Sequence, residues 1–172
     1  MRIIRKVFSL YLLCSLFSWT NIQQDECVFD SSSITEDFLK QNKAIQAYNW
    51  SDNTKTATVL MKTGEYVFVK KWACISYGME VKKITMFPSA GQESISYWQK
   101  DLISFGQQFL GKADFEVYKS VIEKAHWAQG VKKLMINDKY EIHIPHDTYP
   151  EFFAMLERRE DMVVVTLYYY MN

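Results

Sequence analysis

Alternating apolar and polar positions predict three consecutive strands in the first half of the chain. We expect them over residues 56–62, 66–74 and 80–87, the first two joined by a short turn at Gly64 and the third closed by Pro88. In the second segment, one face of the strand would carry Tyr66, Phe68, Lys70 and Trp72, and the other would carry Val67, Val69, Lys71 and Ala73. Connections this short cannot make parallel crossovers, so the pattern predicts an antiparallel meander.

Helical spacing replaces this alternation in four segments. Apolar residues recur every three or four positions in residues 93–110 and again in residues 114–125, so each segment predicts an amphipathic helix. A capping box at Ser33–Glu36 predicts an earlier helix that runs to about Ala47. A similar box at Thr148–Glu151, with Phe152, Met155 and Leu156 on one side, predicts a short late helix.

The C-terminal part returns to sheet. Residues 131–136 and 140–144 predict a hairpin, and residues 162–171 predict a last strand. The last strand is apolar on both faces, so we expect it inside the sheet with cover on both sides. Separate runs of strands and helices indicate the α+β class: a single domain over residues 21–172, with a mostly antiparallel sheet of about six strands and three to four helices.

Residues 1–20 have the layout of a secretory signal peptide. Arg2, Arg5 and Lys6 precede an apolar run over residues 7–17, and Thr20 precedes the expected cleavage position. Because a bilayer span needs about 20 apolar residues, the short run favours cleavage over a retained membrane anchor, which remains the alternative. The sequence therefore predicts a periplasmic or secreted protein that meets the membrane only transiently, through this segment.

Charge argues against binding to nucleic acid. The full chain of 172 residues has 20 basic and 20 acidic residues, and removal of residues 1–20 takes away three cations and no acids. The mature chain thus carries a net charge of −3, without the basic surface that nucleic acids require.

Two cysteines remain in the mature chain, Cys27 and Cys74. An even number of cysteines in an exported protein predicts one disulfide, which would attach the N-terminal segment to a central strand. Asn49 begins a glycosylation sequon with a tryptophan in its middle position, which is a poor acceptor.

Catalytic motifs give little support for an enzyme. His143, His146 and Asp147 form the one cluster that suggests a metal-dependent enzyme or another hydrolase, but their spacing matches no standard zinc motif. The sequence has no phosphate-binding loop, no dinucleotide fingerprint and no nucleophile elbow, so we expect neither a cofactor nor a metal.

The aromatic content of 16% is the unusual feature of the composition. Tyr149, Tyr168 and Tyr170 are the candidate binding residues, because tyrosine buries a large area at interfaces and keeps a hydroxyl for hydrogen bonds. Since side chains alternate along a strand, Tyr169 must face away from its two tyrosine neighbours. The sequence thus favours an exported, non-catalytic binding protein that occludes a protein partner. An inhibitor and an immunity-type protein are two examples of this class. The alternative is the exported enzyme centred on His143, His146 and Asp147.

Overall fold

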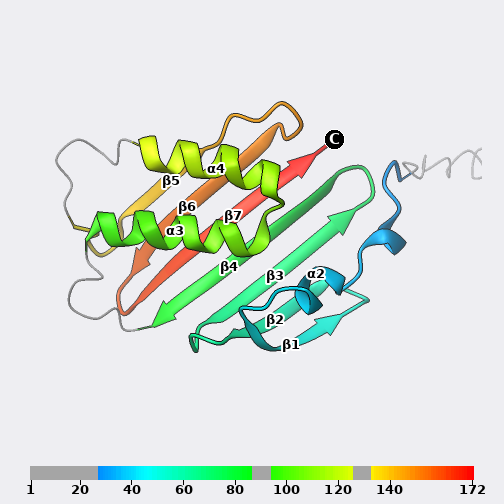
Figure 1. Cartoon of the computed structure of the whole chain (residues 1–172), viewed down its shortest axis with the longest axis horizontal. Helices are drawn as coiled ribbons and strands as arrows, with labels where there is room; N and C mark the ends of the chain where they lie inside the picture. Colours follow the sequence, from blue (N-terminus) through cyan, green and yellow to red (C-terminus); the bar gives the residue numbers. More distant parts are fainter. Residues whose placement is uncertain (1–26, 87–93, 126–132) are drawn as a thin grey trace, which may run out of the picture.

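The computed structural model describes residues 27–86, 94–125 and 133–172, which form one antiparallel sheet with helices against it (Figure 1). The described residues contain seven strands in the order β1-β2-β3-β4-β7-β6-β5. The α+β class is therefore confirmed, with one strand more than the expected number of about six. The predicted signal peptide, residues 1–20, lies outside the described residues.

The predicted meander is confirmed and extended by one strand. Strand β1 (Ile45–Ser51) pairs with β2 (Thr56–Met61), β2 with β3 (Tyr66–Ala73) and β3 with β4 (Tyr77–Met86), all antiparallel. Gly64 turns the chain between β2 and β3 with φ of 88°, a conformation that suits a residue without Cβ.

Both central helices are where the apolar spacing predicts them. Helix α3 covers Ile95–Phe109 and α4 covers Lys112–Lys124, and the two lie side by side in front of the sheet (Figure 1). Gly106 allows their close approach, because a Cβ there would overlap the Tyr118 ring of α4. The buried Tyr118 hydroxyl donates a hydrogen bond to the Leu102 carbonyl at 3.0 Å. Tyr118 thus holds α3 and α4 together through contacts buried between them.

The last three strands complete the sheet from its far edge inward. Strand β5 (Lys139–His143) lies at that edge, β6 (Glu151–Arg159) pairs with it, and β7 (Met162–Met171) enters between β6 and β4. The prediction that the last strand lies inside the sheet is confirmed, since β7 has a neighbour on each side.

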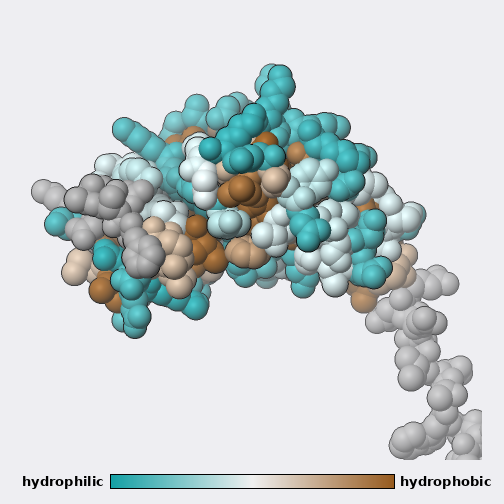
Figure 2. Space-filling model, turned by 90° about the horizontal axis from the view of Figure 1, so that it is seen from below, coloured by the Kyte–Doolittle hydropathy of each residue, from teal (hydrophilic) through white to brown (hydrophobic). Residues whose placement is uncertain are grey.

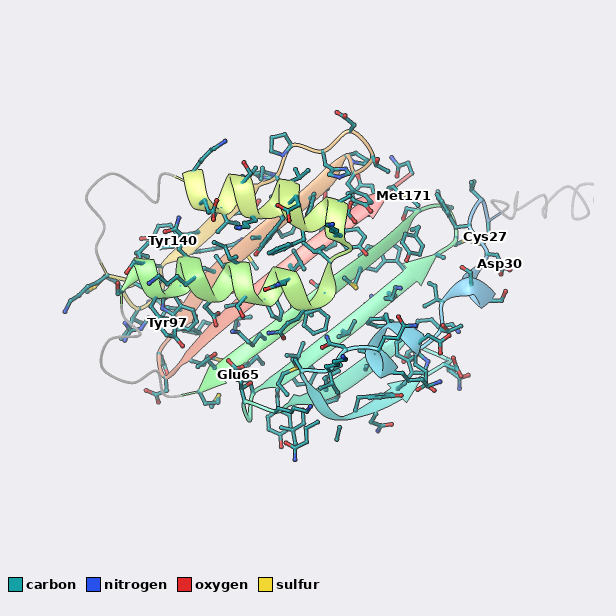
Figure 3. The ribbon with its side chains drawn as sticks, viewed as in Figure 1. Cys27, Asp30, Glu65, Tyr97, Tyr140 and Met171 are labelled. Atoms are coloured by element: carbon teal, nitrogen blue, oxygen red, sulfur yellow. A yellow bond between two sulfur atoms is a disulfide. The ribbon has the colours of Figure 1, made fainter. Side chains whose placement is uncertain are left out.

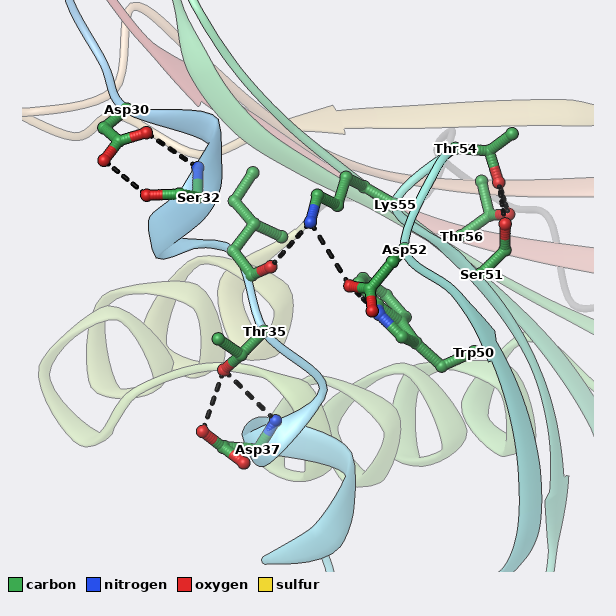
Figure 4. A network of polar contacts seen from close by, with 11 residues as sticks. Asp30, Ser32, Thr35, Asp37, Trp50, Ser51, Asp52, Thr54, Lys55 and Thr56 are labelled. Carbon is green, nitrogen blue, oxygen red and sulfur yellow. Dashed lines mark hydrogen bonds and ion pairs between the residues drawn. The ribbon is translucent and has the colours of Figure 1, made fainter.

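The N-terminal segment covers the part of the sheet that α3 and α4 leave free. It contains a 3₁₀ turn, η1 (Ser31–Ser33), and one short helix, α2 (Asp37–Lys40). Lys55, in the β1–β2 turn, donates to the Ile34 carbonyl at 3.2 Å and contacts Asp52 at 3.3 Å (Figure 4). This contact joins the segment to the sheet, and Ile34 and Leu39 are buried beneath it.

The predicted helix from Ser33 to about Ala47 is wrong. Helix α2 ends at Lys40. Two residues later, the Asn42 side-chain oxygen accepts from the Ala44 amide at 3.0 Å, and its side-chain amide donates to the Gln108 carbonyl at 2.8 Å. These bonds turn the chain, and the following residues pair as β1 with β2. Side-chain hydrogen bonding and sheet pairing therefore override the local apolar spacing.

The predicted helix after Thr148 is also wrong, because Glu151–Arg159 is strand β6. Its buried residues Phe152, Ala154 and Leu156 alternate, as they do on one face of a strand. The expected hairpin of 131–136 with 140–144 is not formed either: residues 131–132 lie outside the described residues, Lys133 makes an isolated bridge to Ser94, and β5 pairs with β6.

The core lies between the helices and one face of the sheet. Its largest fully buried side chains include Trp98, Tyr118 and Phe152. In Figure 2, brown hydrophobic residues gather in the middle of the visible face and teal hydrophilic residues line its upper rim. The expected cover on both sides of the last strand is wrong, because the described helices all pack on the same face.

The predicted disulfide between Cys27 and Cys74 is present. It ties the start of the described chain to the end of β3, at the same end of the molecule as Met171 (Figure 3). The Phe29 amide also donates to the Cys74 carbonyl at 2.8 Å, so backbone pairing supports the covalent link. In the described part of the chain, no helix is long and apolar enough to cross a bilayer.

Candidate functional site

One face of the sheet is left without a covering layer in the described residues, and we call it the open face. It is built from the strand positions that alternate with the core positions, so a residue such as Phe153 lies on it while Phe152 faces α4. Large apolar side chains lie exposed on it: Tyr66 is 55% exposed and Phe68 44% exposed. Exposed aromatic residues on a sheet are candidates for binding.

Four aromatic side chains on the open face form a contiguous cluster, which we call the aromatic row. Its members are Trp72 on β3, Phe153 on β6, and Tyr168 and Tyr170 on β7. The Tyr168 ring lies at the centre, with ring centroids 4.8 Å from Phe153, 5.5 Å from Trp72 and 6.2 Å from Tyr170. The register explains the closest contact, since Phe153 and Tyr168 are direct cross-strand partners.

Gly78 makes the aromatic row possible. It lies on β4 between Trp72 of β3 and Tyr170 of β7, and a Cβ at this position would overlap the Trp72 indole. Without a side chain at Gly78, the indole can lie across β4 and reach Tyr168. Glycine is therefore required here for close packing, not for an unusual backbone conformation.

The hydroxyl groups of the row remain available for hydrogen bonds. Burial and the nearby Glu151 carboxylate raise the pKa of Tyr168, so its hydroxyl keeps its proton well above neutral pH. Tyr168 and Tyr170 are each only half-buried. The row thus offers both apolar ring area and hydrogen-bond donors.

The charged groups near the row are largely paired with one another. Glu80 and Lys82 form an ion pair at 2.7 Å on β4, and Glu141 lies 3.0 Å from the His143 ring on β5. Beside Phe68 the open face has a hollow of about 190 Å³, which β2, β3 and β4 line near Lys70 and Glu80. The open face therefore has a depression beside Phe68 and carries charges of both signs.

Tyr149 lies on the other side of the sheet from Tyr168 and Tyr170. Its ring packs against buried Tyr169 at 4.8 Å, and its hydroxyl donates to Asp114 of α4 at 3.2 Å. Burial, followed by the effect of Asp114, raises the pKa of Tyr149 to about 12. The structure thus brings together two of the three predicted binding tyrosines and places the third among residues that hold α4 against the sheet.

The predicted alternative cluster of His143, His146 and Asp147 does not converge. His143 lies on the open face beside Phe153, whereas His146 packs on the helix side with its ring 5.9 Å from Phe152. Asp147 is exposed in the loop between them and β6. Among the described residues, no group of three histidine, cysteine or acidic side chains is placed to hold a metal ion.

His146 instead pairs with Asp114, at 3.4 Å between Nε2 and Oδ1. Its Nδ1 accepts from the Thr148 amide at 3.2 Å, so Nε2 carries the proton that points at the carboxylate. The His146 ring also stacks on Tyr149, with centroids 4.5 Å apart. This arrangement attaches the loop before β6 to the first turn of α4.

Sequence reasoning missed Trp72 and Phe153 as members of the site. The alternation in residues 66–74 already placed Trp72 on one face with Tyr66 and Phe68, and that signal was sufficient to nominate it. Phe153 was hidden because Phe152, Met155 and Leu156 also fit a helical stripe. No protein-family model, curated protein or solved structure matches the chain, so the functional interpretation rests on the arrangement of its own side chains.

Proposed function

We propose that this protein is an exported, non-catalytic binding protein that occludes a protein partner through its open face. The observation that carries the proposal is the aromatic row of Trp72, Phe153, Tyr168 and Tyr170 on a sheet face that no described element covers. An inhibitor or an immunity-type protein acts in this way, by covering the working surface of its target.

The shape of the open face favours a protein partner over a small ligand. Small ligands bind in concave pockets that bury most of their surface, whereas the aromatic row lies on the outer face of a sheet. Tyrosine and tryptophan are the residue types that contribute most to protein interfaces. The hollow of about 190 Å³ beside Phe68 is large enough to receive a single partner side chain.

Charge further restricts the partner. Because Lys82 pairs with Glu80 and Lys139 with Glu141, the open face has few unpaired cations to attract nucleic acid or an anionic membrane. We therefore expect the contacting patch of the partner to be apolar at its centre, with polar groups that accept hydrogen bonds from Tyr168 and Tyr170.

Two features support a periplasmic or extracellular location for this interaction. Residues 1–20 have the layout of a signal peptide, and the Cys27–Cys74 disulfide is compatible with an oxidising compartment. Intact-mass analysis of protein from the producing cell tests this location, because the mature form should lack residues 1–20. Detection of those residues in the exported protein would contradict cleavage and favour the retained anchor.

The binding proposal is tested by capture from the cell envelope or culture medium with paired variants. We expect the wild-type protein to retain one partner, for which Tyr168→Ala has an affinity at least about fivefold lower, since an interface anchor contributes more than about 1 kcal/mol. Met135→Ala is the matched control, because Met135 is 60% exposed but lies in the loop before β5. Equal capture by wild type and both variants would contradict the proposal.

The enzyme alternative has a separate test. The double variant His143→Ala with His146→Ala should not lose a biological activity that depends only on binding. This holds provided that its melting temperature equals that of the parent protein. Abolition of activity in a folded double variant would favour the enzyme. Because His146 pairs with Asp114, the folded state of this variant must be checked first.

A further inference from the structure

The two edges of the sheet differ in the side chains that they carry. Strand β1 lies at one edge and β5 at the other, and no described strand lies beyond either of them (Figure 1). Strand β1 contains no charged residue and no proline, whereas β5 carries Lys139, Glu141 and His143, all exposed. Charged side chains and proline are among the features that prevent unwanted strand pairing at a sheet edge. Strand β1 therefore lacks a protection that β5 has.

The hydrogen bonds between β2 and β3 establish which residues of β2 bond to β1. The Met61 amide donates to the Glu65 carbonyl at 2.9 Å, and the Lys71 amide donates to the Lys55 carbonyl at 2.9 Å. Odd-numbered residues of β2 thus direct their backbone groups toward β3. Because these directions alternate along a strand, the even-numbered residues of β2 bond to β1.

The partners of these even-numbered residues in β1 are Ala47, Asn49 and Ser51. Tyr48 and Trp50 alternate with them, so their backbone N–H and C=O groups point away from β2 and out of the sheet. Within the described part of the chain, no strand pairs with this outer side of β1. An exposed row of backbone donors and acceptors of this kind is a template for another strand.

The outward backbone groups of β5 belong to different kinds of residue. Ile144, just after β5, donates its amide to the Phe152 carbonyl at 2.7 Å, so even-numbered residues at this edge bond to β6. The outward groups are therefore those of Lys139, Glu141 and His143. A strand that approaches β5 meets an ionisable side chain at each of these positions, whereas a strand that approaches β1 meets none.

The backbone of β1 is complementary to a second copy of itself. A register shift at the start of the strand leaves residues 47–51 as its regular part, with Asn49 in the middle. When two such segments pair antiparallel with Asn49 opposite Asn49, Tyr48 of each copy lies opposite Trp50 of the other. Each of these two pairs then exchanges both of its N–H···O=C bonds, so every outward group of Tyr48 and Trp50 has a partner.

The side chains of β1 also suit this register. On the open face, Ala47 of one copy lies opposite Ser51 of the other, and both are small. On the helix side, Tyr48 lies opposite Trp50, and cross-strand aromatic pairs stabilise a sheet. Since β1 is uncharged, the two copies meet without repulsion between like charges.

We propose that the protein forms a homodimer in which the β1 strands of two copies pair antiparallel about Asn49. The two seven-stranded sheets then become one continuous sheet. The two-fold axis of an antiparallel strand pair is perpendicular to the sheet, so both open faces point to the same side. The dimer contact includes no residue of the aromatic row, and the dimer therefore does not rest on the proposed binding function.

Sedimentation equilibrium of the purified, disulfide-bonded protein tests this proposal. We expect the wild-type protein to show a monomer–dimer equilibrium. Tyr48→Pro should weaken dimerisation at least about tenfold, because proline removes one outward amide from each copy. The β1–β2 hydrogen bonds should remain, since an edge strand tolerates proline where its N–H faces solvent. Tyr48→Ala loses the ring but keeps the amide, and it should weaken dimerisation less than Tyr48→Pro.

Glu141→Pro is the matched control, because it removes an outward amide from β5, at the other edge of the same sheet. It should leave the dimer dissociation constant within about twofold of wild type. A monomeric wild-type protein, or a dimer that Glu141→Pro weakens as much as Tyr48→Pro does, would overturn the proposal.

A charge exchange at Asn49 tests the register and replaces the proline variant if that variant does not fold. Asn49→Lys and Asn49→Glu each place like charges opposite one another at the two-fold axis, and each should weaken dimerisation about two- to fivefold. A mixture of the two variants should restore it. Thr58→Lys is the control, since Thr58 is exposed and pairs with Asn49 one strand further in. No recovery in the mixture, or an equal loss with Thr58→Lys, would contradict the register.

Discussion

Strand β7 contributes three successive tyrosines, and their surroundings differ strongly between the two faces of the sheet. Tyr169 is 9% exposed and packs against Phe152 and Tyr149 beneath α4. Tyr168 and Tyr170 lie on the open face, half-buried among Phe153 and Trp72. The same residue type thus serves the core on one face and a candidate binding surface on the other.

This difference indicates that stability depends mainly on one face of the sheet and binding on the other. Burial of apolar area stabilises a fold in proportion to the area removed from water, and that area lies mainly on the helix side. The open face keeps aromatic area in partial contact with water, where a partner can still bury it. Substitutions on the two faces should therefore affect different measurements.

The largest expected effect is a difference in stability between variants at two adjacent positions of β6 that lie on opposite faces of the sheet. Phe152→Ala should reduce the free energy of unfolding by about 3–5 kcal/mol, because it leaves a cavity among Tyr118, Tyr149 and Tyr169. Phe153→Ala should cost only about 1 kcal/mol, because its ring is half-buried. Urea denaturation of both variants measures the contrast. Equal losses would mean that the open face is part of the core.

Removal of the disulfide tests whether packing on the helix side keeps the protein folded without the covalent link. The Cys27–Cys74 bridge closes a loop with a sequence separation of 47 residues. In the chain-entropy model such a loop contributes about 4 kcal/mol, so Cys27→Ser with Cys74→Ser should lower the denaturation midpoint strongly. Thiol labelling of the unfolded, unreduced wild-type protein should find neither cysteine free. Labelling of both residues, or an unchanged midpoint in the double variant, would contradict the prediction.

Gly78→Ala perturbs the aromatic row with the smallest possible change in sequence. The added methyl group would overlap the Trp72 indole and lie 2.7 Å from the Tyr169 carbonyl oxygen. We expect a loss of about 1–3 kcal/mol from this overpacking, with a change in tryptophan fluorescence as the indole moves. Unchanged stability and emission would show that Trp72 does not depend on Gly78.

The smallest effect is expected from alkaline pH on the helix side. The Tyr149 phenol ionises near its ordinary value of 10.0 in the unfolded chain but at about 12 in the folded protein. Its contribution to stability is thus complete below pH 10 and is lost as the pH rises from 10 to 12. Tyr149→Phe should make the free energy of unfolding fall less steeply in this interval. Identical slopes for the two proteins would contradict the assigned shift.

How much of the site the sequence predicts depends on the residue. Alternation along β7 was enough to separate Tyr169 from Tyr168 and Tyr170, because neighbouring side chains in any strand point to opposite faces. The same sequence did not separate Tyr149 from them. Its side is decided by the loop before β6, which His146 and Asp114 hold in place.

Several local elements and one covalent link could be predicted from the chain alone. Strands β2, β3 and β4, helices α3 and α4, and the Cys27–Cys74 pair follow from periodicity, turn residues and cysteine number, which are properties of short segments or of composition. The edge strands, the open face and its hollow depend on tertiary contacts. Residues 45–51 and 151–159 became strands because β2, β5 and β7 supplied partners, although their local spacing also fits a helix. The open face and the unpaired edge of β1 depend on which elements meet across the sheet, and such long-range contacts leave no local pattern in a single chain.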